Sequence, residues 1–278
     1  MSDFLRELFN LDGRTVVVTG AAGYFGRYMA EAFLEAGCRV VLLSRSSTVA
    51  TQCTAYRRRY GDARAEAHVV DFYSRPELDA VCRDVATASP PDVIVNNAFD
   101  FSPGTGFNTP EGRLETLGFE QWERAFESGL YWAVRTTQIF GEAMRRKGGG
   151  SIVNVASMYG IVSPRPDLYE GTRYFNPPTY TVVKAGLIAF TRYVAAFWGH
   201  DGIRCNALLP GAFPNVESAS DNAVEPANDF LSRLADRTLL KRVGHPRDLR
   251  GALLLLASDA GSYITGQGIV VDGGWTVS

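Results

Sequence analysis

Seven short runs of apolar, mostly β-branched residues recur along the chain, and they constrain its fold more than any other feature. The runs are nearly continuous in hydrophobicity, which is typical of strands covered by helices on both faces, as in a parallel sheet. They are "TVVVT" (15–19), "RVVLLS" (39–44), "AHVVD" (67–71), "DVIVN" (92–96), "SIVNVA" (151–156), "IRCNAL" (203–208) and "GIVVD" (268–272). The sequence therefore predicts about seven buried parallel strands.

Segments with the spacing of amphipathic helices lie between these runs. They cover about 24–36, 76–88, 119–146, 179–199 and 246–258. Because strand and helix alternate almost throughout, we expect an α/β fold, a Rossmann-type doubly wound sheet with right-handed crossovers. No repeat, low-complexity linker or block of charge divides the 278 residues, which predicts a single domain over 1–278.

The charge balance and the cysteines exclude several kinds of partner. Twenty-eight basic and thirty acidic residues give a formal charge of -2, which provides no broad attraction for nucleic acid or anionic lipid. We find no signal peptide and no apolar run approaching the roughly 20 residues that span a bilayer. Cys38, Cys53, Cys82 and Cys205 are far apart and form no C-x-x-C pair, so we expect neither a disulfide framework nor a metal site. The sequence predicts a soluble, cytoplasmic protein that acts on a small molecule.

The first run leads directly into the glycine-rich stretch "TGAAGYFGRYMAEAF". Gly20, Gly23 and Gly26 fall at the turn from strand to helix, where glycine lets backbone N–H groups approach a pyrophosphate at a positive helix end. The G-x-x-G-x-x-G spacing alone would also suit a plain tight turn. Its position between a strand and an amphipathic helix favours a dinucleotide site, which Tyr24 and Phe25 are expected to border.

The end of the second run indicates which dinucleotide is preferred. Sites that prefer NAD place a carboxylate there to bind the ribose 2'-hydroxyl, whereas this chain has Ser44 and Arg45. The guanidinium of Arg45 can pair with a 2'-phosphate through a charge-assisted fork. We therefore predict NADP, with NAD possible; the alternative is that Arg45 is a solvated loop charge.

A tyrosine and a lysine four residues apart head the apolar run after residue 177. If residues 179–199 form a helix, Tyr180 and Lys184 lie one turn apart on one face, and Thr179 is a candidate N-cap. A nearby ammonium favours the phenolate and lowers the pKa of the phenol, so Tyr180 can exchange the proton that moves when a carbonyl is reduced. Such a pair alone would often be a chance surface pair.

Ser157 and two long loops follow strands at the same expected sheet edge. Ser157, just after the fifth run, offers a hydroxyl donor for a carbonyl oxygen. Residues 160–178 and 211–229 are rich in Pro, Gly and polar residues. Because ligands of open α/β sheets bind at the carboxyl ends of the strands, we expect these segments to be substrate loops. The alternative is two surface loops without a role in binding.

Together these stretches resemble the short-chain dehydrogenase/reductase family over nearly the whole chain. The matching stretches are "VVVTGAAGYFG", "NNA" at 96–98, "SIVNVAS", "YTVVK", "IRCNALLPG" and "ITGQGIVVDGGW". The glycine spacing is similar to that of the extended members, whereas the C-terminal third is similar to the classical members. The resemblance implies a Rossmann fold, NAD(P)-linked hydride transfer and homo-oligomers, dimers or tetramers.

The resemblance also implies roles for individual residues. Ser157 would bind the carbonyl and Tyr180 would be the acid/base. Lys184 would lower the pKa of the phenol and hold the nicotinamide ribose. The other cofactor-binding positions would be Asp71 and Phe72 at adenine, Asn97 with Ala98 at the ribose, and Pro210, Gly211 and Phe213 at the nicotinamide.

Three further departures from the family pattern concern the catalytic region. The family usually carries a catalytic asparagine where this chain has Gly129, so we expect Ser128 or another group to substitute, or turnover to be slow. If the proton relay is merely incomplete, Gly129→Asn should raise the rate; a fall would show a site built around glycine. Phe99 replaces the usual glycine after "NNA" and is expected to narrow the pocket. The gap from Ser157 to Tyr180 is about ten residues longer than usual.

The inserted loop suggests the substrate. It offers hydrogen-bonding groups and aromatic faces that suit a polyhydroxylated ring, namely Arg165, Asp167, Tyr169, Glu170, Arg173, Tyr174 and Phe175. We therefore predict an oxidoreductase acting on a sugar, sugar acid or sugar nucleotide. The alternatives are a 3-oxoacyl thioester reductase and, in a different class, a cofactor-binding sensor or scaffold without turnover. The loop could also only cover the site or build an oligomer contact.

Overall fold

Seven parallel strands form one sheet in the computed structural model, which describes residues 3–172, 175–217 and 229–278. The strands are β1 (Thr15–Thr19), β2 (Arg39–Ser44), β3 (Ala65–Val69), β4 (Val93–Asn96), β5 (Gly150–Val155), β6 (Ile203–Pro210) and β7 (Gly268–Val271). Their order is β3-β2-β1-β4-β5-β6-β7. The order reverses between β1 and β4, which opens a crevice at the carboxyl ends of these strands. The predicted Rossmann-type fold is confirmed.

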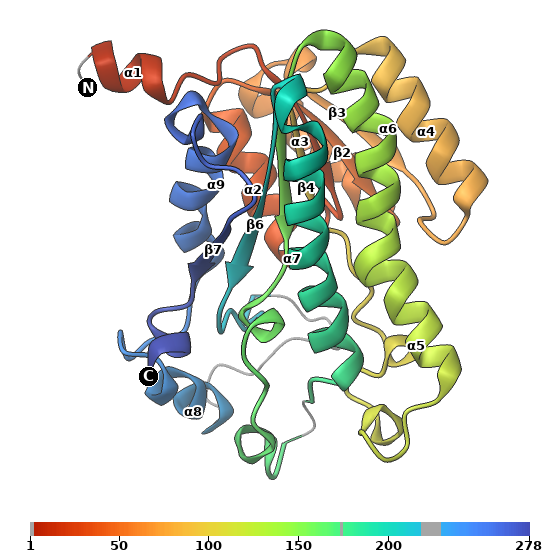
Figure 1. Ribbon diagram of the computed structural model, residues 1–278, viewed down its shortest axis with the longest axis vertical. Coiled ribbons are helices and arrows are strands. Elements are labelled where there is room, and N and C mark those ends of the chain that lie inside the picture. The colour runs from red at the N-terminus through yellow and green to blue at the C-terminus, as the bar shows by residue number, and fades with distance from the viewer. Residues whose placement is uncertain (1–2, 173–174, 218–228) are drawn as a thin grey trace.

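Helices cover both faces of the sheet (Figure 1). One layer contains α2 (Tyr24–Glu35), α3 (Thr48–Tyr60) and α9 (Arg250–Ala257), and the other contains α4 (Arg75–Ala88), α6 (Trp132–Lys147) and α7 (Pro178–Trp198). Successive strand residues point to opposite faces, so Val16 and Val18 pack in the first core and Val17 in the second. Strands β1, β2, β4, β5 and β6 are buried almost throughout, which explains why they are apolar without alternation. The edge strands β3 and β7 are partly exposed, so the prediction of seven buried strands is wrong for these two.

The remaining described α-helices are α1 (Asp3–Leu8), α5 (Phe119–Phe126) and α8 (Asp229–Arg237). Figure 1 shows α5 and α8 at the end of the molecule toward which the strands point, on opposite sides, with α8 next to the C-terminus of the chain. The predicted helix over 119–146 is divided, because a π-helical turn at Glu127–Tyr131 separates α5 from α6. The sequence did not predict α3, which buries only Val49 and Cys53 and so has a weak apolar stripe.

Helix α7 corrects two expectations. It begins at Pro178 after Pro177, and the predicted cap Thr179 instead donates its hydroxyl to the carbonyl oxygen of Thr105 at 2.8 Å. Contrary to the sequence prediction, α7 with its extension to Asp201 is long and apolar enough to cross a membrane by length and composition. A core helix passes the same test, and α7 packs its buried side chains against the sheet.

Candidate active site

A cavity of about 1020 Å³ lies at the carboxyl ends of the strands. One part, the glycine-loop end, is lined by the turn after β1, the ends of β2 and β3 and one residue of α4. Its lining residues are Gly20, Ala22, Gly23, Tyr24, Phe25, Ser44, Arg45, Ser46, Val69, Asp71, Phe72 and Glu77. The other part, the aromatic end, is lined by residues from 99–108, 157–180 and 212–234. The cavity thus occupies the place where ligands of open α/β sheets bind.

Most predicted site residues meet in this cavity. Those that line it are Gly20, Gly23, Tyr24, Phe25, Ser44, Arg45, Asp71, Phe72, Asn97, Ala98, Ser157, Tyr180, Pro210, Gly211 and Phe213. Gly26 and Lys184 are buried and do not line it. A Cβ at Gly26 would lie 2.2 Å from the carbonyl oxygen of Gly20, so this glycine permits close packing of α2 against the turn.

The turn after β1 is held closely against the end of β4. Gly20 has a φ of +64°, and a Cβ there would lie 2.9 Å from the Cα of Ala98. The Asn97 amide nitrogen donates to the carbonyl oxygens of Thr19 at 3.0 Å and Gly20 at 3.2 Å. Backbone in this position, followed directly by the N-terminus of α2, fits a dinucleotide pyrophosphate because helix N-termini favour anions.

Arg45 has an anionic partner that the sequence did not reveal. Its Nη2 lies 3.2 Å from Oδ1 of Asp100, and its guanidinium lies over the rings of Tyr73 and Trp132. Arg45 is therefore neither a free guanidinium nor a plain solvated loop charge. Ser44 and Arg45 still line the glycine-loop end.

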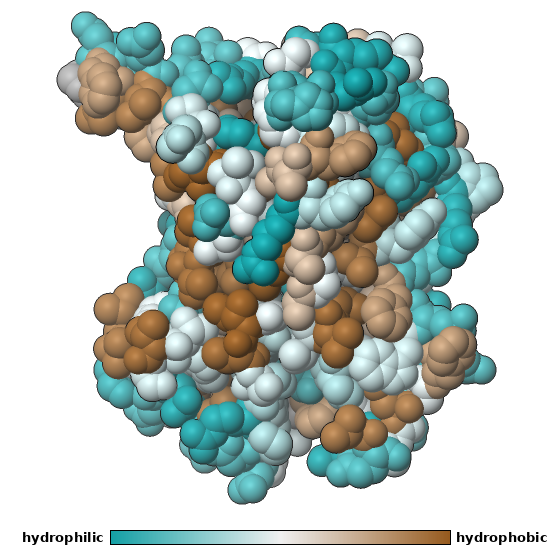
Figure 2. All heavy atoms as spheres, viewed as in Figure 1, coloured by the Kyte–Doolittle hydropathy of each residue, from teal (hydrophilic) through white to brown (hydrophobic). Residues whose placement is uncertain are grey.

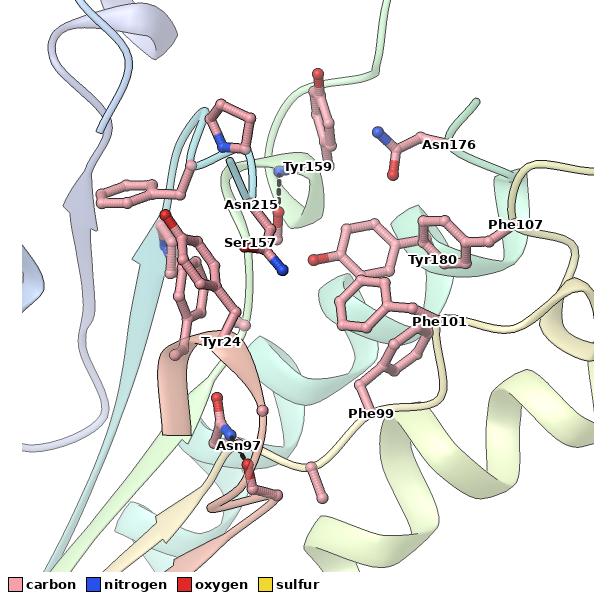
Figure 3. Close-up of a pocket in the computed structure, with 18 of the residues that line it drawn as sticks. Tyr24, Asn97, Phe99, Phe101, Phe107, Ser157, Tyr159, Asn176, Tyr180 and Asn215 are labelled. Atoms are coloured by element: carbon pink, nitrogen blue, oxygen red, sulfur yellow. Dashed lines mark hydrogen bonds between the residues drawn. The ribbon is translucent and has the colours of Figure 1, made fainter. Parts of the chain in front are cut away.

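Tyr180 and Ser157 face each other across the aromatic end. Figure 3 shows the phenol of Tyr180, on α7, pointing toward Ser157, which follows β5. Burial raises the pKa of Tyr180 to about 12, against a smaller opposing effect of the Ser157 hydroxyl. The Ser157 oxygen accepts a hydrogen bond from the backbone N–H of Tyr159 at 3.1 Å, which fixes its side chain.

Lys184 lies behind Tyr180. Its Nζ donates to the carbonyl oxygen of Val155 at 2.7 Å and lies 5.5 Å from the centre of the Tyr180 ring. Burial lowers the pKa of Lys184 to about 7. The pKa of Tyr180 is raised in the protein alone, not lowered as the sequence predicted, because loss of water favours the neutral form of both side chains.

Phe99 and Gly129 are packed together beside this lysine. Gly129 lies in the π-helical turn, and a Cβ there would lie 2.4 Å from Cγ2 of Val183 and 2.9 Å from Cε2 of Phe99. The Phe99 ring also contacts Tyr180 at 5.3 Å between centroids and lies 5.2 Å from Nζ of Lys184. An asparagine at 129 does not fit here, so the expected gain from Gly129→Asn is withdrawn.

The aromatic end is formed largely by residues that sequence reasoning missed. Phe101 and Phe107 pack with Phe99 around Tyr180, at centroid distances of 5.9 Å and 5.2 Å from its ring (Figure 3). Three amides, Asn108, Asn176 and Asn215, add hydrogen-bonding groups to the lining. The run "FDFSPGTGF" from Phe99 to Phe107 was the available signal, because two of its three phenylalanines follow the recognised "NNA" within five residues.

Only part of the predicted substrate loops faces the cavity. Tyr169 and Phe175 line it, whereas Arg165 and Asp167 pair with each other on the surface, with N–O distances of 3.0 and 2.7 Å. Glu170 is exposed. Arg173 and Tyr174 lie outside the described residues, as does 218–228 of the second loop, whose residues 211–215 line the cavity.

The site thus combines a glycine turn after β1 with a tyrosine and a serine that face each other at the other end of the same cavity. A family model described as enoyl-(acyl carrier protein) reductase matches residues 20–276. Galactitol 2-dehydrogenase from Rhizobium johnstonii is 34% identical over 98% of both chains. The chain belongs to the short-chain dehydrogenase/reductase family and is an NAD(P)-dependent oxidoreductase.

Two solved structures show the same architecture with ligands bound. Gluconate 5-dehydrogenase from Burkholderia cenocepacia, in complex with NADP and tartrate, is 25% identical, covers 99% of both chains and has a TM-score of 0.82. L-Sorbose reductase from Gluconobacter frateurii, in complex with NADPH and L-sorbose, is 26% identical, covers 97% of this chain and 99% of its own, and has a TM-score of 0.81.

Proposed function

We propose that the protein exchanges hydride between NADP and an uncharged sugar or polyol. The observation that carries this proposal is the juxtaposition of Tyr180 and Ser157 in a cavity whose aromatic end combines ring faces with three amides. Aromatic faces suit the C–H faces of a sugar, and amides can donate to and accept from its hydroxyls. The galactitol and L-sorbose in the names of two related proteins are neutral and support this class, whereas the gluconate of a third is a sugar acid and supports only the wider class of sugar-like substrates.

Each residue of the site would have a separate role in cofactor binding or proton transfer. The nicotinamide, when bound, supplies or accepts the hydride. Ser157 donates a hydrogen bond to the substrate carbonyl oxygen, and Tyr180 donates or accepts the proton there. Lys184 would stabilise the phenolate as it forms, since one turn of helix separates the two side chains. The turn at Gly20 and the N-terminus of α2 would hold the pyrophosphate.

The charges around the cavity favour a neutral substrate. Its charged lining residues, Arg45, Asp71 and Glu77, belong to the glycine-loop end, and no charged side chain lines the aromatic end among residues 3–172, 175–217 and 229–278. A carboxylate or phosphate buried there would lack a cation to offset its desolvation. A neutral sugar or polyol is therefore favoured over the sugar acid or sugar nucleotide of the broader prediction.

The outer face of α7 supports a homo-oligomer, a dimer or tetramer. Tyr193 and Phe197 stack at 5.9 Å between ring centroids and are 66% and 57% exposed. Neighbouring exposed aromatic side chains are typical of a surface that another protein chain covers. Figure 2 shows apolar side chains distributed over the face on which α7 lies in Figure 1. The four cysteines are buried and free, which supports a reducing, cytoplasmic location.

Paired titrations with NADPH and NADH, followed by nicotinamide fluorescence, test the proposal first. A panel of polyols, keto-sugars, sugar acids, and 3-oxoacyl and enoyl thioesters is then added. Turnover of a neutral keto-sugar or polyol is the expected result. The description of the matching family model favours acyl thioesters as the second candidate, and turnover of only these would replace the proposed substrate class. Cofactor binding without any turnover would favour a sensor.

A further inference from the structure

Asp100 joins the two ends of the cavity. It follows β4 between Phe99 and Phe101, and its side chain is only 5% exposed. One carboxylate oxygen lies 3.2 Å from Nη2 of Arg45, and the other lies 3.2 Å from Nε of Arg124 and accepts the Tyr73 hydroxyl at 2.7 Å. Two cations from distant segments thus share one buried carboxylate.

This carboxylate is held in its charged form. Burial opposes ionisation, but the Tyr73 hydroxyl and the charge of Arg45 together keep the pKa of Asp100 below its ordinary value. Arg124 also lies 4.0 Å from the centre of the Tyr73 ring, so the cluster is packed as well as charged. Both cations lie 3.2 Å from the carboxylate, but Arg45 lines the cavity and Arg124 does not, so Arg45 is the cation that a ligand in the cavity can reach.

We propose that Asp100 sets the cofactor preference by competing with a cofactor 2'-phosphate for the guanidinium of Arg45. This inference rests on the proposed function, in which Ser44 and Arg45 flank the adenosine ribose. Arg45 extends from the end of β2 over Tyr73 and Trp132 to Asp100, instead of remaining beside Ser44. Only Nη2 of Arg45 contacts Asp100, at 3.2 Å, and a 2'-phosphate that draws the guanidinium toward Ser44 would break this contact. Asp100 would then keep the Arg124 ion pair and the hydrogen bond from the Tyr73 hydroxyl.

The competition has a direction that can be measured. A 2'-phosphate gains the Arg45 pair only after Asp100 has lost it, so the preference for NADPH over NADH is smaller than a free arginine would give. NADH lacks the phosphate, and its affinity should change little when the pair is removed. Arg124 moderates the effect because it neutralises part of the charge that holds Arg45.

Dissociation constants of NADPH and NADH, measured by fluorescence titration of the full chain, test the inference. Asp100→Asn keeps the shape of the side chain and should raise the NADPH-over-NADH preference by about 3- to 10-fold. Arg124→Gln should act in the opposite direction, by about 2- to 3-fold, because Asp100 then holds Arg45 more tightly. The second variant also keeps the test decisive if the first does not fold.

Arg45→Gln supplies the control that separates competition from a general field effect. In that background Asp100→Asn should leave the preference within about 2-fold, since the residue through which it acts is gone. An equal gain in both backgrounds, an unchanged preference, or a preference that moves toward NADH in Asp100→Asn would overturn the inference. Failure of the wild type to bind either dinucleotide would instead overturn the proposed function.

Discussion

The two ends of the cavity are built in different ways. The glycine-loop end is formed by the ends of neighbouring strands, with backbone brought close to backbone at Gly20 and charged side chains such as Arg45, Asp71 and Glu77 around it. The aromatic end is formed by side chains from three segments that are far apart in the sequence, and its described lining is uncharged. The first end suits a fixed anionic ligand, and the second suits a neutral one.

This difference shows where selectivity can vary within one fold. The backbone at the glycine-loop end cannot change without clashes, because Gly20 and Gly26 leave no room for a Cβ. At the aromatic end, Phe101 and Phe175 come from loops and Tyr169 ends a short 3-10 helix between two strands, and such connections tolerate substitution more readily than strands. Side-chain substitution can therefore alter the aromatic end more readily than the glycine-loop end.

The largest expected effect is a loss of turnover from a change at the aromatic end, with cofactor binding at the glycine-loop end kept. Tyr180→Phe removes the proton carrier and keeps the ring that packs with Phe99 and Phe107. We expect turnover to fall by about 10²- to 10⁴-fold, while the dissociation constant of NADPH stays within a few-fold. Steady-state kinetics and fluorescence titration measure the two quantities. Tyr193→Phe, on the outer face of α7, is the matched control, and unchanged turnover in Tyr180→Phe would remove the phenol from the mechanism.

The same division explains how much could be predicted from the sequence. Strand runs, the glycine turn and the Ser157, Tyr180 and Lys184 set are local patterns, so the sheet and the glycine-loop end followed from them. The pairing of Arg45 with Asp100 and the fit of Phe99 over Gly129 are tertiary contacts, and no spacing rule shows them. Arg165 and Asp167 were expected at the substrate, but two residues apart in a loop they pair with each other.

The next effect concerns the cost of burying Lys184. Its pKa is lowered from 10.5 to about 7 by burial, so between about pH 7 and 10 the unfolded chain binds more protons and stability rises with pH. Below about pH 7 the folded protein bears the full free-energy cost of burying the protonated lysine. Lys184→Met removes this cost of burying a charged lysine. The free energy of unfolding of the variant, minus that of the wild type, should therefore fall by several kcal/mol as the pH rises from 6 to 9, at about 1.4 kcal/mol per pKa unit.

Urea unfolding at several pH values, without added cofactor, measures this change. Lys184→Met also loses the hydrogen bond to the Val155 carbonyl, which shifts the whole curve but not its slope. Lys241→Met, at an exposed lysine, is the control and should differ from wild type by a constant amount. A constant difference for Lys184→Met as well would show that burial does not suppress the charge of this lysine.

A smaller effect is expected where the aromatic end meets the π-helical turn. Gly129→Ala places a Cβ against Val183 and Phe99, which must move, so we expect about 1–3 kcal/mol of destabilisation and reduced turnover. Gly186→Ala, on α7, is the matched control because its Cβ would lie 3.5 Å from Leu130, an ordinary contact. Thermal unfolding and steady-state kinetics compare the pair. Equal stability of the two variants would show that the site is not built around Gly129.

The smallest effect tests whether the two ends act independently. Glu217 joins the segment after β6 to α2 and the turn before α9: its carboxylate lies 2.8 Å from Nη2 of Arg27, accepts the Tyr28 hydroxyl at 2.7 Å and lies 3.0 Å from Nε2 of His245. Just before it, Asn215 lines the cavity. Glu217 therefore attaches part of the aromatic end to the helix that follows the glycine turn.

Glu217→Gln keeps one acceptor and removes the charge, which weakens this attachment without creating a clash. Because each partly exposed ion pair is worth only about 0.2–1 kcal/mol, we expect KM for the substrate to rise by about 2- to 5-fold with little change in kcat. Glu115→Gln, at another exposed carboxylate, should leave both constants unchanged. If NADPH affinity falls together with substrate affinity, the attachment couples the ends; if only KM rises, Glu217 positions the aromatic end alone. No change in either quantity would show that the segment after β6 is held without it.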